Sequence, residues 1–329
     1  MTNTPDRSVR LGPGAEFDLI RRFVGARPEL PDSVLVGPGD DAAVLEGGWV
    51  ISSDLSVEDV HFRRAWLSDA EIGHRAAAAA LSDLAAMAAT PVALLVSIAA
   101  PASVDLEALA ASVRAVARSV GASVAGGDLS RSPGPLVLDV VAIGRTERPV
   151  LRNGVRPGDE VWVTGSLGAS AAAVRAWRSG GEPSVELRAA FARPVPRVAE
   201  ALGLVERDVA RAMIDLSDGL AGDAGHLAAA SGVCVTIEAA HVPISGAAVE
   251  ALGEAAALEA ALHGGEDYEL CFAARRDAVD PAAFAERHGT TLTRVGTAAE
   301  GQGVRLEERD GSTRPLERGG YDHWAGGGS

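Results

Sequence analysis

The stretch Gly37-Pro38-Gly39-Asp40-Asp41-Ala42-Ala43-Val44, written GPGDDAAV, places two adjacent carboxylates in a loop rich in glycine and proline, directly before an apolar segment. Other acids follow the same pattern, each at an edge between an apolar run and a turn. They are Asp54, Asp59, Asp83, Asp128, Asp215, Asp218, Glu266 and Asp267. Neighbouring carboxylates repel each other unless a cation lies between them, so the pattern predicts a shared cation site and not a solvated acidic face.

The composition is that of an ordered protein with two domains of ordinary size. The chain has 329 residues, 47% of them hydrophobic, and a mean hydropathy of +0.12, which supplies ample apolar material for a core. Its net charge of −15 disfavours a broad surface for nucleic acid or anionic membrane, and we expect neither as a partner.

The basic residues and the cysteines exclude further classes. All 30 basic residues are arginine, which excludes a Walker-type phosphate lysine, the strand lysine of a protein kinase and a Schiff-base lysine. Cys234 and Cys271 are the two cysteines, too few for a disulfide framework or a zinc cluster, and they fit a reducing cytoplasm. We expect no signal peptide at the N-terminus, and no membrane span in the alanine-rich stretch 76–100, which Asp83 and Pro91 interrupt.

Hydrophobic periodicity predicts a mixed α/β fold in both halves of the chain. In the first half we expect helices over 16–24, 69–89 and 105–120, and strands over 42–46, 49–54, 92–99 and 136–144. The segment RTERPVLRNGVRPGD, residues 145–159, is rich in Arg, Pro and Gly, which places the domain boundary there and gives domains 1–148 and 149–329. In the second half we expect strands at EVWVTG, AMID, YELCF, TLTRVG and GVRLEER, helices at GASAAAVRAW and after DLSDG, and a flexible end at GGGS.

The segment IDLSDGL, residues 214–220, is the sharpest local signal. Asp215 is predicted to end a strand, with Ser217 or Asp218 placed to cap the helix that follows. Capping alone needs one such residue, and three polar groups in four positions exceed that need, which favours a functional site.

Asp83 lies within a predicted helix whose neighbouring positions are alanine and methionine. A carboxylate on such an apolar face is costly unless a cation or hydrogen-bond donors neutralise it, although a helix edge that faces water would also explain it. Strand alternation in VEDVHF puts Asp59 and His61 on one face, but a lone histidine is more often a core or surface residue than a catalyst. GGDLSRS and HGGEDYEL each carry acids beyond a predicted double-glycine turn, where the backbone could approach a phosphate or a metal.

This set of ligands is rich in oxygen and poor in sulfur and histidine, so it selects hard cations, and Mg²⁺ is the usual one beside phosphates. Several Mg²⁺ ions would turn the repulsion between carboxylates and a triphosphate into attraction. Asp40 and Asp41 are therefore predicted to hold metal that is bound to a nucleotide.

Taken together, the motifs resemble the thiamine-monophosphate kinase family, which shares a superfamily with aminoimidazole ribonucleotide synthetase, selenophosphate synthetase and the hydrogenase maturation factor HypE. The matching segments run in family order from residue 37 to residue 324. They are GPGDDAAV, SSDLSVEDVHF, LSDLAAM, GGDLSRS, LRNG, IDLSDGL, GGEDYELCF and GYDHW.

The resemblance implies two α/β domains of the aminoimidazole ribonucleotide synthetase type, with N-terminal strands that pair across a homodimer. It implies ATP as co-substrate, several Mg²⁺ ions and thiamine monophosphate as acceptor. By this resemblance the metal positions are Asp41, Ser52, Ser53, Asp54, Asp83, Asp128, Asp215 and Asp218. The nucleotide contacts are Gly127, Asp128, Arg152 and Ser217, and the substrate contacts are His61, Glu266 and Tyr321. Leu129 and Ser53 depart from the family pattern, because threonine is usual at both positions.

The reaction implied is transfer of the γ-phosphoryl group of ATP to thiamine monophosphate. A phosphate oxygen already carries the nucleophilic charge at neutral pH, so we expect direct in-line transfer without a covalent enzyme intermediate. The chain lacks the lysines and the positioned cysteines expected of the other superfamily members. Two alternatives remain open: another ATP-dependent enzyme of the superfamily, or a non-catalytic nucleotide and metal sensor.

Overall fold

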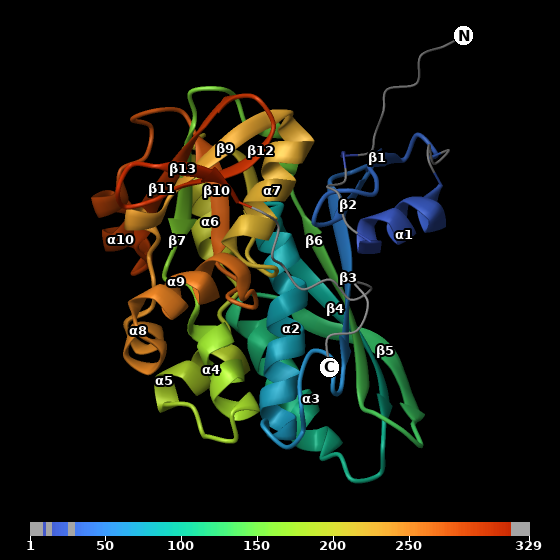
Figure 1. Cartoon of the computed structure of the whole chain (residues 1–329). Coiled ribbons are helices and arrows are strands. Elements are labelled where there is room, and N and C mark those ends of the chain that lie inside the picture. The colour runs from blue at the N-terminus through green and yellow to red at the C-terminus, as the bar shows by residue number, and fades with distance from the viewer. Residues whose placement is uncertain (1–8, 11–14, 26–29, 317–329) are drawn as a thin grey trace.

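The computed structural model describes residues 9–10, 15–25 and 30–316, and these form two β-sheets with helices packed against them (Figure 1). Helix α2 (Asp69–Ala86) runs between the first sheet and the elements of the second half (Figure 1). This mixed α/β architecture confirms the predicted fold class. The domain boundary at residues 148 and 149 stays a prediction.

The first sheet has the strand order β1-β2-β3-β6-β4-β5, in which β4 and β5 are parallel and the other neighbours antiparallel. Helices α2 and α3 cover one of its faces, and α1 precedes it in the chain. The bounds are α1 Ala15–Val24, β1 Val34–Val36, β2 Ala43–Leu45, β3 Trp49–Val57, β4 Thr90–Ala100, α3 Leu106–Ser119, β5 Ser123–Arg131 and β6 Val137–Arg145.

Alternation along β6 shows how this sheet is buried. Leu138, Val140 and Ala142 are buried under α2, whereas Val141 and Ile143 on the opposite face are partly exposed. Such alternation is typical of a sheet that is covered on one side. The opposite face of the first sheet is therefore open in the single chain.

The second sheet has the strand order β13-β12-β9-β11-β7-β10-β8. The strands are β7 Glu160–Thr164, β8 Ala210–Asp215, β9 Val233–Glu238, β10 Leu270–Ala274, β11 Leu292–Glu300, β12 Gly303–Glu307 and β13 Thr313–Pro315. The helices are α4 Ala169–Arg178, α5 Val185–Ala192, α6 Val198–Glu206, α7 Leu220–Ser231, α8 Gly246–Leu252, α9 Glu254–His263 and α10 Pro281–His288, and short 3₁₀ turns lie at Arg152–Gly154 and Ala239–His241.

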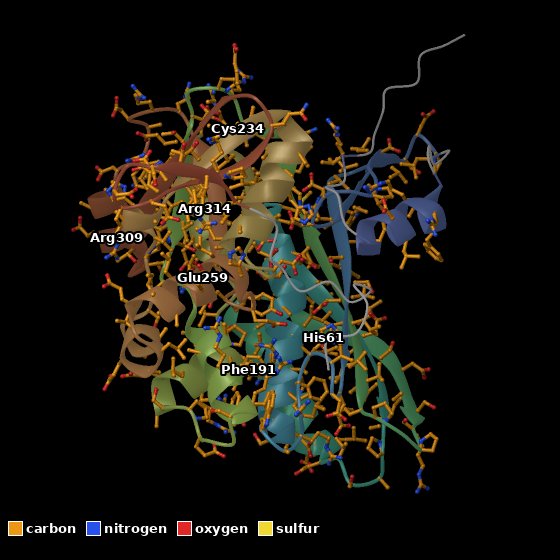
Figure 2. All side chains as sticks on the ribbon, in the orientation of Figure 1. His61, Phe191, Cys234, Glu259, Arg309 and Arg314 are labelled. Carbon is orange, nitrogen blue, oxygen red and sulfur yellow. The ribbon has the colours of Figure 1, made fainter. Side chains whose placement is uncertain are left out.

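The central strands of this sheet are buried on both faces, which explains why they are continuous apolar runs. Cys271 packs in the core under α7 and α9, whereas its neighbour Phe272 packs in the core under α6 and α10. Cys234 lies on β9 near the end of the molecule opposite α4 and α5 (Figure 2). Both cysteines are free thiols and buried.

Two local predictions in the first half are wrong. Gly126 and Gly127 lie within strand β5 and not in a turn, and a register shift between Leu94 and Leu95 marks a bulge beside them. Gly127 adopts a φ of +145°, and a Cβ there would collide with the backbone of β4.

The second error concerns VEDVHF: β3 ends at Val57, and Asp59 has a φ of +65° in a turn, so strand alternation does not relate Asp59 to His61.

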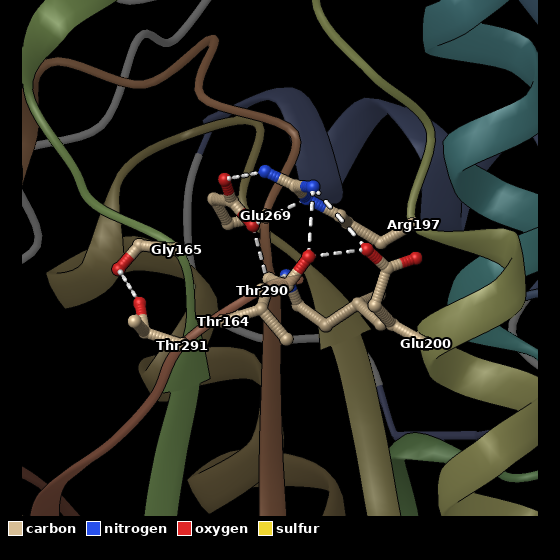
Figure 3. A network of polar contacts seen from close by, with 8 residues as sticks. Thr164, Gly165, Arg197, Glu200, Glu269, Thr290 and Thr291 are labelled. Carbon is tan, nitrogen blue, oxygen red and sulfur yellow. Dashed lines mark hydrogen bonds and ion pairs between the residues drawn. The ribbon is translucent and has the colours of Figure 1, made fainter. Parts of the chain in front are cut away.

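A buried polar network joins α6 to strand β10 (Figure 3). The Arg197 guanidinium donates to both oxygens of Glu269, at 2.7 and 2.5 Å, and to Glu200 at 3.2 Å. Thr164 donates to Glu269 at 2.5 Å, and Thr290 donates to Glu200 at 2.7 Å. Because Glu269 immediately precedes β10, this network fixes the end of the loop that carries Glu266.

We predict that Arg197→Met lowers the free energy of unfolding by about 3–5 kcal/mol, because it leaves a buried carboxylate without its cation. Arg287→Met is the matched control, since its ion pair with Glu206 is 48% and 62% exposed and such pairs contribute about 0–1 kcal/mol. Urea unfolding measures the loss in free energy of unfolding for both variants. Equal losses in the two variants would contradict a special role for the network.

Candidate active site

Three carboxylates from distant parts of the chain meet where α2 passes the end of β8. Asp41 lies in the loop before β2, Asp83 lies in the last part of α2, and Asp215 is the last residue of β8. One oxygen from each lies within 4.8 Å of the others. The sequence placed all three in a metal site, and the fold brings them together.

The residues around this triad restrain its carboxylates. Ser52 on β3 donates a short hydrogen bond to Asp83. The Arg152 guanidinium makes two bonds to Asp41, at 2.7 and 3.2 Å, and its backbone N–H donates to Asp40 at 3.1 Å. Arg152 therefore lies against the predicted metal ligand Asp41, while Asp40 helps to anchor the loop.

Burial and mutual repulsion act on the triad together. Burial, followed by the charge of Asp41, raises the pKa of Asp215 to about 7. Burial and the charge of Asp215 raise the pKa of Asp83 well above its ordinary value. A hard divalent cation would relieve both effects, because its charge replaces the protons that these oxygens otherwise bind. The donor set thus fits Mg²⁺.

A second group of possible ligands lies at the start of α7. Atoms of Asp218, Asp223 and His226 lie within 4.8 Å of one another. The prediction that Ser217 or Asp218 caps α7 is wrong: the N-cap is Gly219, whose φ is +95°, and it makes no side-chain capping bond. Instead, the Asp223 carboxylate accepts from the Asp218 N–H at 3.1 Å.

A cavity of about 380 Å³ opens beside these acids. Four of the predicted site residues line it together: Asp54, His61, Asp218 and Glu266. Figure 2 shows His61 and Phe191 near the lower part of α2, from opposite halves of the chain. The other lining residues are Asp59, Val60, Phe62, Arg63, Trp66, Ser170, Ala171, Val174, Arg175, Arg178, Phe191, Ser217, Gly264 and Tyr268. We call this cavity the acceptor pocket.

The loop 264–268 reaches the pocket in a constrained conformation. Gly265, Glu266 and Tyr268 all have positive φ, between +52° and +67°, which is costly for residues with a side chain. Backbone bonds hold the loop in place: the Glu266 N–H donates to Ser217 at 2.8 Å, and the Tyr268 N–H donates to Leu216 at 2.9 Å. The motif IDLSDGL and the motif GGEDYEL therefore form one unit.

Some predicted site residues lie elsewhere in the single chain. Ser53 faces away from Ser52 and donates to Asp139 at 2.7 Å on the open face of the first sheet. Gly127 and Asp128 lie on β5, which β6 and β4 separate from β3, and they line a different cavity of about 530 Å³. Tyr321 lies outside the described residues, as does the terminal GGGS.

Among the residues near the site that carried no predicted role are Arg75, Asp223 and His226. The spacing of Asp223 and His226 on one helical face was a usable signal, because residues three apart are neighbours on a helix. Arg75 stands inside an alanine run, and only the fold reveals its partners.

Among the described residues, no helix is long and apolar enough to cross a membrane.

Comparison with known proteins defines the class of protein first. Residues 39–146 match the AIR synthase related protein N-terminal domain, and residues 156–308 match the C-terminal domain of the same family. The chain therefore belongs to the AIR synthase related family, and more particularly to its thiamine-monophosphate kinase branch, as the relatives below show.

The thiamine-monophosphate kinase of Salmonella typhimurium is 36% identical over 94% of this chain and 98% of its own length. That of Methanopyrus kandleri is 35% identical, over 89% and 93%. The crystal structure of the enzyme from Stenotrophomonas maltophilia K279a is 39% identical, with a TM-score of 0.74 over 91% of this chain and 97% of that one. AaThiL complexed with AMPPCP and TMP is 29% identical, with a TM-score of 0.81 over 95% and 97%.

The raised carboxyl pKa values predict how pH and Mg²⁺ change stability. Asp54, at about 6, and Asp215, at about 7, bind protons more tightly in the folded protein than in the unfolded chain. Their contribution to stability without metal is therefore present below pH ~4 and lost as the pH rises through ~7. Mg²⁺ should raise the melting temperature more at pH 8 than at pH 5, by about 2 °C or more.

Thermal melts at both pH values, with and without MgCl₂, test this expectation, with Asp215→Asn as the comparison. The variant lacks one titrating carboxyl and should show a smaller difference between the two pH values. An Mg²⁺ effect that is the same at pH 5 and pH 8 would show that these acids do not hold the ion.

Proposed function

We propose that the protein transfers the γ-phosphoryl group of ATP to thiamine monophosphate, giving thiamine diphosphate. The carrying observation is that two predicted metal ligands, Asp54 and Asp218, line the same cavity as two predicted substrate contacts, His61 and Glu266. The names of the relatives, and the AMPPCP and TMP in the AaThiL complex, support this choice of substrates; we read TMP there as thiamine monophosphate.

The metal ions are part of the proposal. Asp41, Asp83 and Asp215 would hold Mg²⁺, and Asp54 and Asp218 would hold it at the edge of the acceptor pocket. When bound, such ions neutralise the negative charge on the transferring phosphoryl group and on both substrates. The chain itself supplies the placement of these carboxylates.

For the nucleotide we propose the cavity between α3 and β5. It is largely apolar, and Gly127 and Asp128 form part of its wall. Its volume of about 530 Å³ suits a base and ribose. Arg152 and Ser217 would contact the phosphates nearer the metal centre.

The surroundings of His61 favour direct in-line transfer. Its Nδ1 atom accepts a hydrogen bond from the Val57 N–H at 3.1 Å, so in the neutral ring the proton resides on Nε2. One ring nitrogen is thus engaged and the other is a donor, which suits orientation of an acceptor phosphate and not nucleophilic attack. Glu266 would contact the organic part of the acceptor, together with Tyr321.

We also propose a homodimer that acts in the cytoplasm. The open face of the first sheet carries Leu55, which is 52% exposed, with partly exposed Val141, Ile143 and Leu95. Apolar side chains on an uncovered sheet face are a suitable contact for a second copy. The family resemblance of the sequence implies that N-terminal strands pair across a homodimer, and we propose that the two copies meet at this open face. The two-domain division at residue 148 belongs to the same proposal.

A non-catalytic sensor of nucleotide and metal is the second candidate. It would retain the carboxylates without needing the substrate side of the pocket. His61 and Glu266 are both present and both line the pocket, which favours the kinase.

One experiment tests the activity and its chemistry. The protein is incubated with γ-labelled ATP and Mg²⁺, first without acceptor and then with thiamine monophosphate, and is quenched in alkali, which preserves phosphohistidine. We expect no label on the protein, and labelled thiamine diphosphate once the acceptor is added. Label on the protein that is chased into product would overturn direct transfer, and ATP binding without any diphosphate would favour the sensor.

A further inference from the structure

Arg75 is a buried cation behind the wall of the acceptor pocket, where it contacts the lining residues Glu266, Phe191 and Tyr268. It lies on α2 with 4% of its surface exposed. One guanidinium nitrogen forms an ion pair with Glu266, and another donates to the Phe191 carbonyl at 2.7 Å. Its carbon lies 3.9 Å from the centre of the Phe191 ring, so both the edge and the face of the guanidinium are held.

Burial of the arginine charge costs desolvation free energy, which its partners offset, and the same partners fix the orientation of the guanidinium. The stacking on Phe191 restricts its plane, and the carbonyl bond restricts its rotation. The remaining edge of the guanidinium points to Glu266. These contacts show that α2 and α5 together set where the Glu266 carboxylate lies.

The contacts of Glu266 leave part of its carboxylate for a ligand. Arg75 and the Tyr268 hydroxyl, at 2.9 Å, both bond to Oε2. Among the described residues these are the side-chain bonds that Glu266 makes, so Oε1 remains for a group in the pocket. A carboxylate oxygen is an acceptor, and it suits N–H donors or cationic rings.

Arg75 also reaches the metal side of the pocket through its charge. Burial raises the pKa of Asp54 to about 6, and the positive charge of Arg75 opposes that rise. The same α2 helix carries Asp83, which belongs to the carboxylate triad. Arg75 therefore stands between the substrate side and the metal side, and its removal should affect the two sides in opposite directions.

We propose that Arg75 is a positioning and specificity-determining residue for the acceptor: its ion pair holds the Glu266 carboxylate so that Oε1 meets a nitrogen-bearing, cationic acceptor ring. This inference rests on the proposed function and names a residue for it that acts through Glu266. Arg75 does not bind the nucleotide or the metal.

The test uses Arg75→Gln, which retains a donor for the Phe191 carbonyl but has no charge. We expect the KM for thiamine monophosphate to rise about tenfold or more, as loss of one charge-assisted bond implies. The Mg²⁺ concentration for half-maximal rate, measured at saturating acceptor, should not rise, because the site near Asp54 becomes more negative. A general disturbance of the fold would raise both the KM for thiamine monophosphate and the Mg²⁺ concentration for half-maximal rate.

Three further variants make the result decisive. In a Glu266→Gln background, Arg75→Gln should change the KM by no more than about twofold, since Arg75 acts through that carboxylate. Arg75→Lys retains the charge and should keep the KM within about threefold of the wild type, which tests the inference even if Arg75→Gln does not fold. Arg188→Met is the control: Arg188 pairs with Glu71 and lies over Trp177, outside the pocket, and should leave the KM unchanged.

A KM within twofold of the wild type in Arg75→Gln would overturn the inference. So would a tenfold rise in Arg75→Lys, or a rise that persists undiminished without the Glu266 charge. Wild-type turnover is measured alongside: its absence would overturn the proposed function itself, whereas normal wild-type turnover with an unaltered KM in Arg75→Gln overturns the role of Arg75 alone.

Discussion

The repulsion among carboxylates held close together in a largely buried cleft is the constraint on which the rest of the structure depends. Asp41, Asp83 and Asp215 come from a loop, a helix and a strand end, and their oxygens lie within 4.8 Å of one another. Such an arrangement disfavours the charged state of each acid. It is tolerated because Arg152 compensates Asp41 and Ser52 bonds to Asp83, and because a divalent ion can complete it. In the function that we propose, this cost in stability is the consequence of a site that binds metal and phosphate.

Helix α2 connects the carboxylate triad to the part of the acceptor pocket that contains Glu266. It is buried between the first sheet and the second half of the chain, so its side chains have little freedom to move. Asp83 near its end faces the metal site, and Arg75 farther back faces Glu266. The strained loop that carries Glu266 is held at one end by Ser217 and Leu216 and at the other by the Arg197 network. The carboxylate triad and the acceptor pocket are thus joined through α2 and this loop.

Much of the site could be predicted because its physics is local. A carboxylate inside an alanine-rich helix, as at Asp83, or at the end of an apolar strand, as at Asp215, is energetically unfavourable among its immediate neighbours. Its presence there therefore indicates a function. The contribution of Arg75 could not be predicted, because its partners Glu266 and Phe191 are distant in sequence. The glycines before Asp128 were misread because a double glycine signals either a turn or a bulged strand, and only the pairing of β4 with β5 decides between them. His61 reached the pocket through a turn that begins where β3 ends, which strand alternation does not reveal.

We propose above all that the carboxylate triad is a metal site that works with a nucleotide. Anomalous diffraction from crystals grown with Mn²⁺ in place of Mg²⁺ and a non-hydrolysable ATP analogue is the sharpest test. We expect an anomalous peak within coordination distance of Asp41, Asp83 and Asp215, at roughly 2–2.5 Å from their oxygens. A bound nucleotide analogue with no metal at these three carboxylates would contradict it.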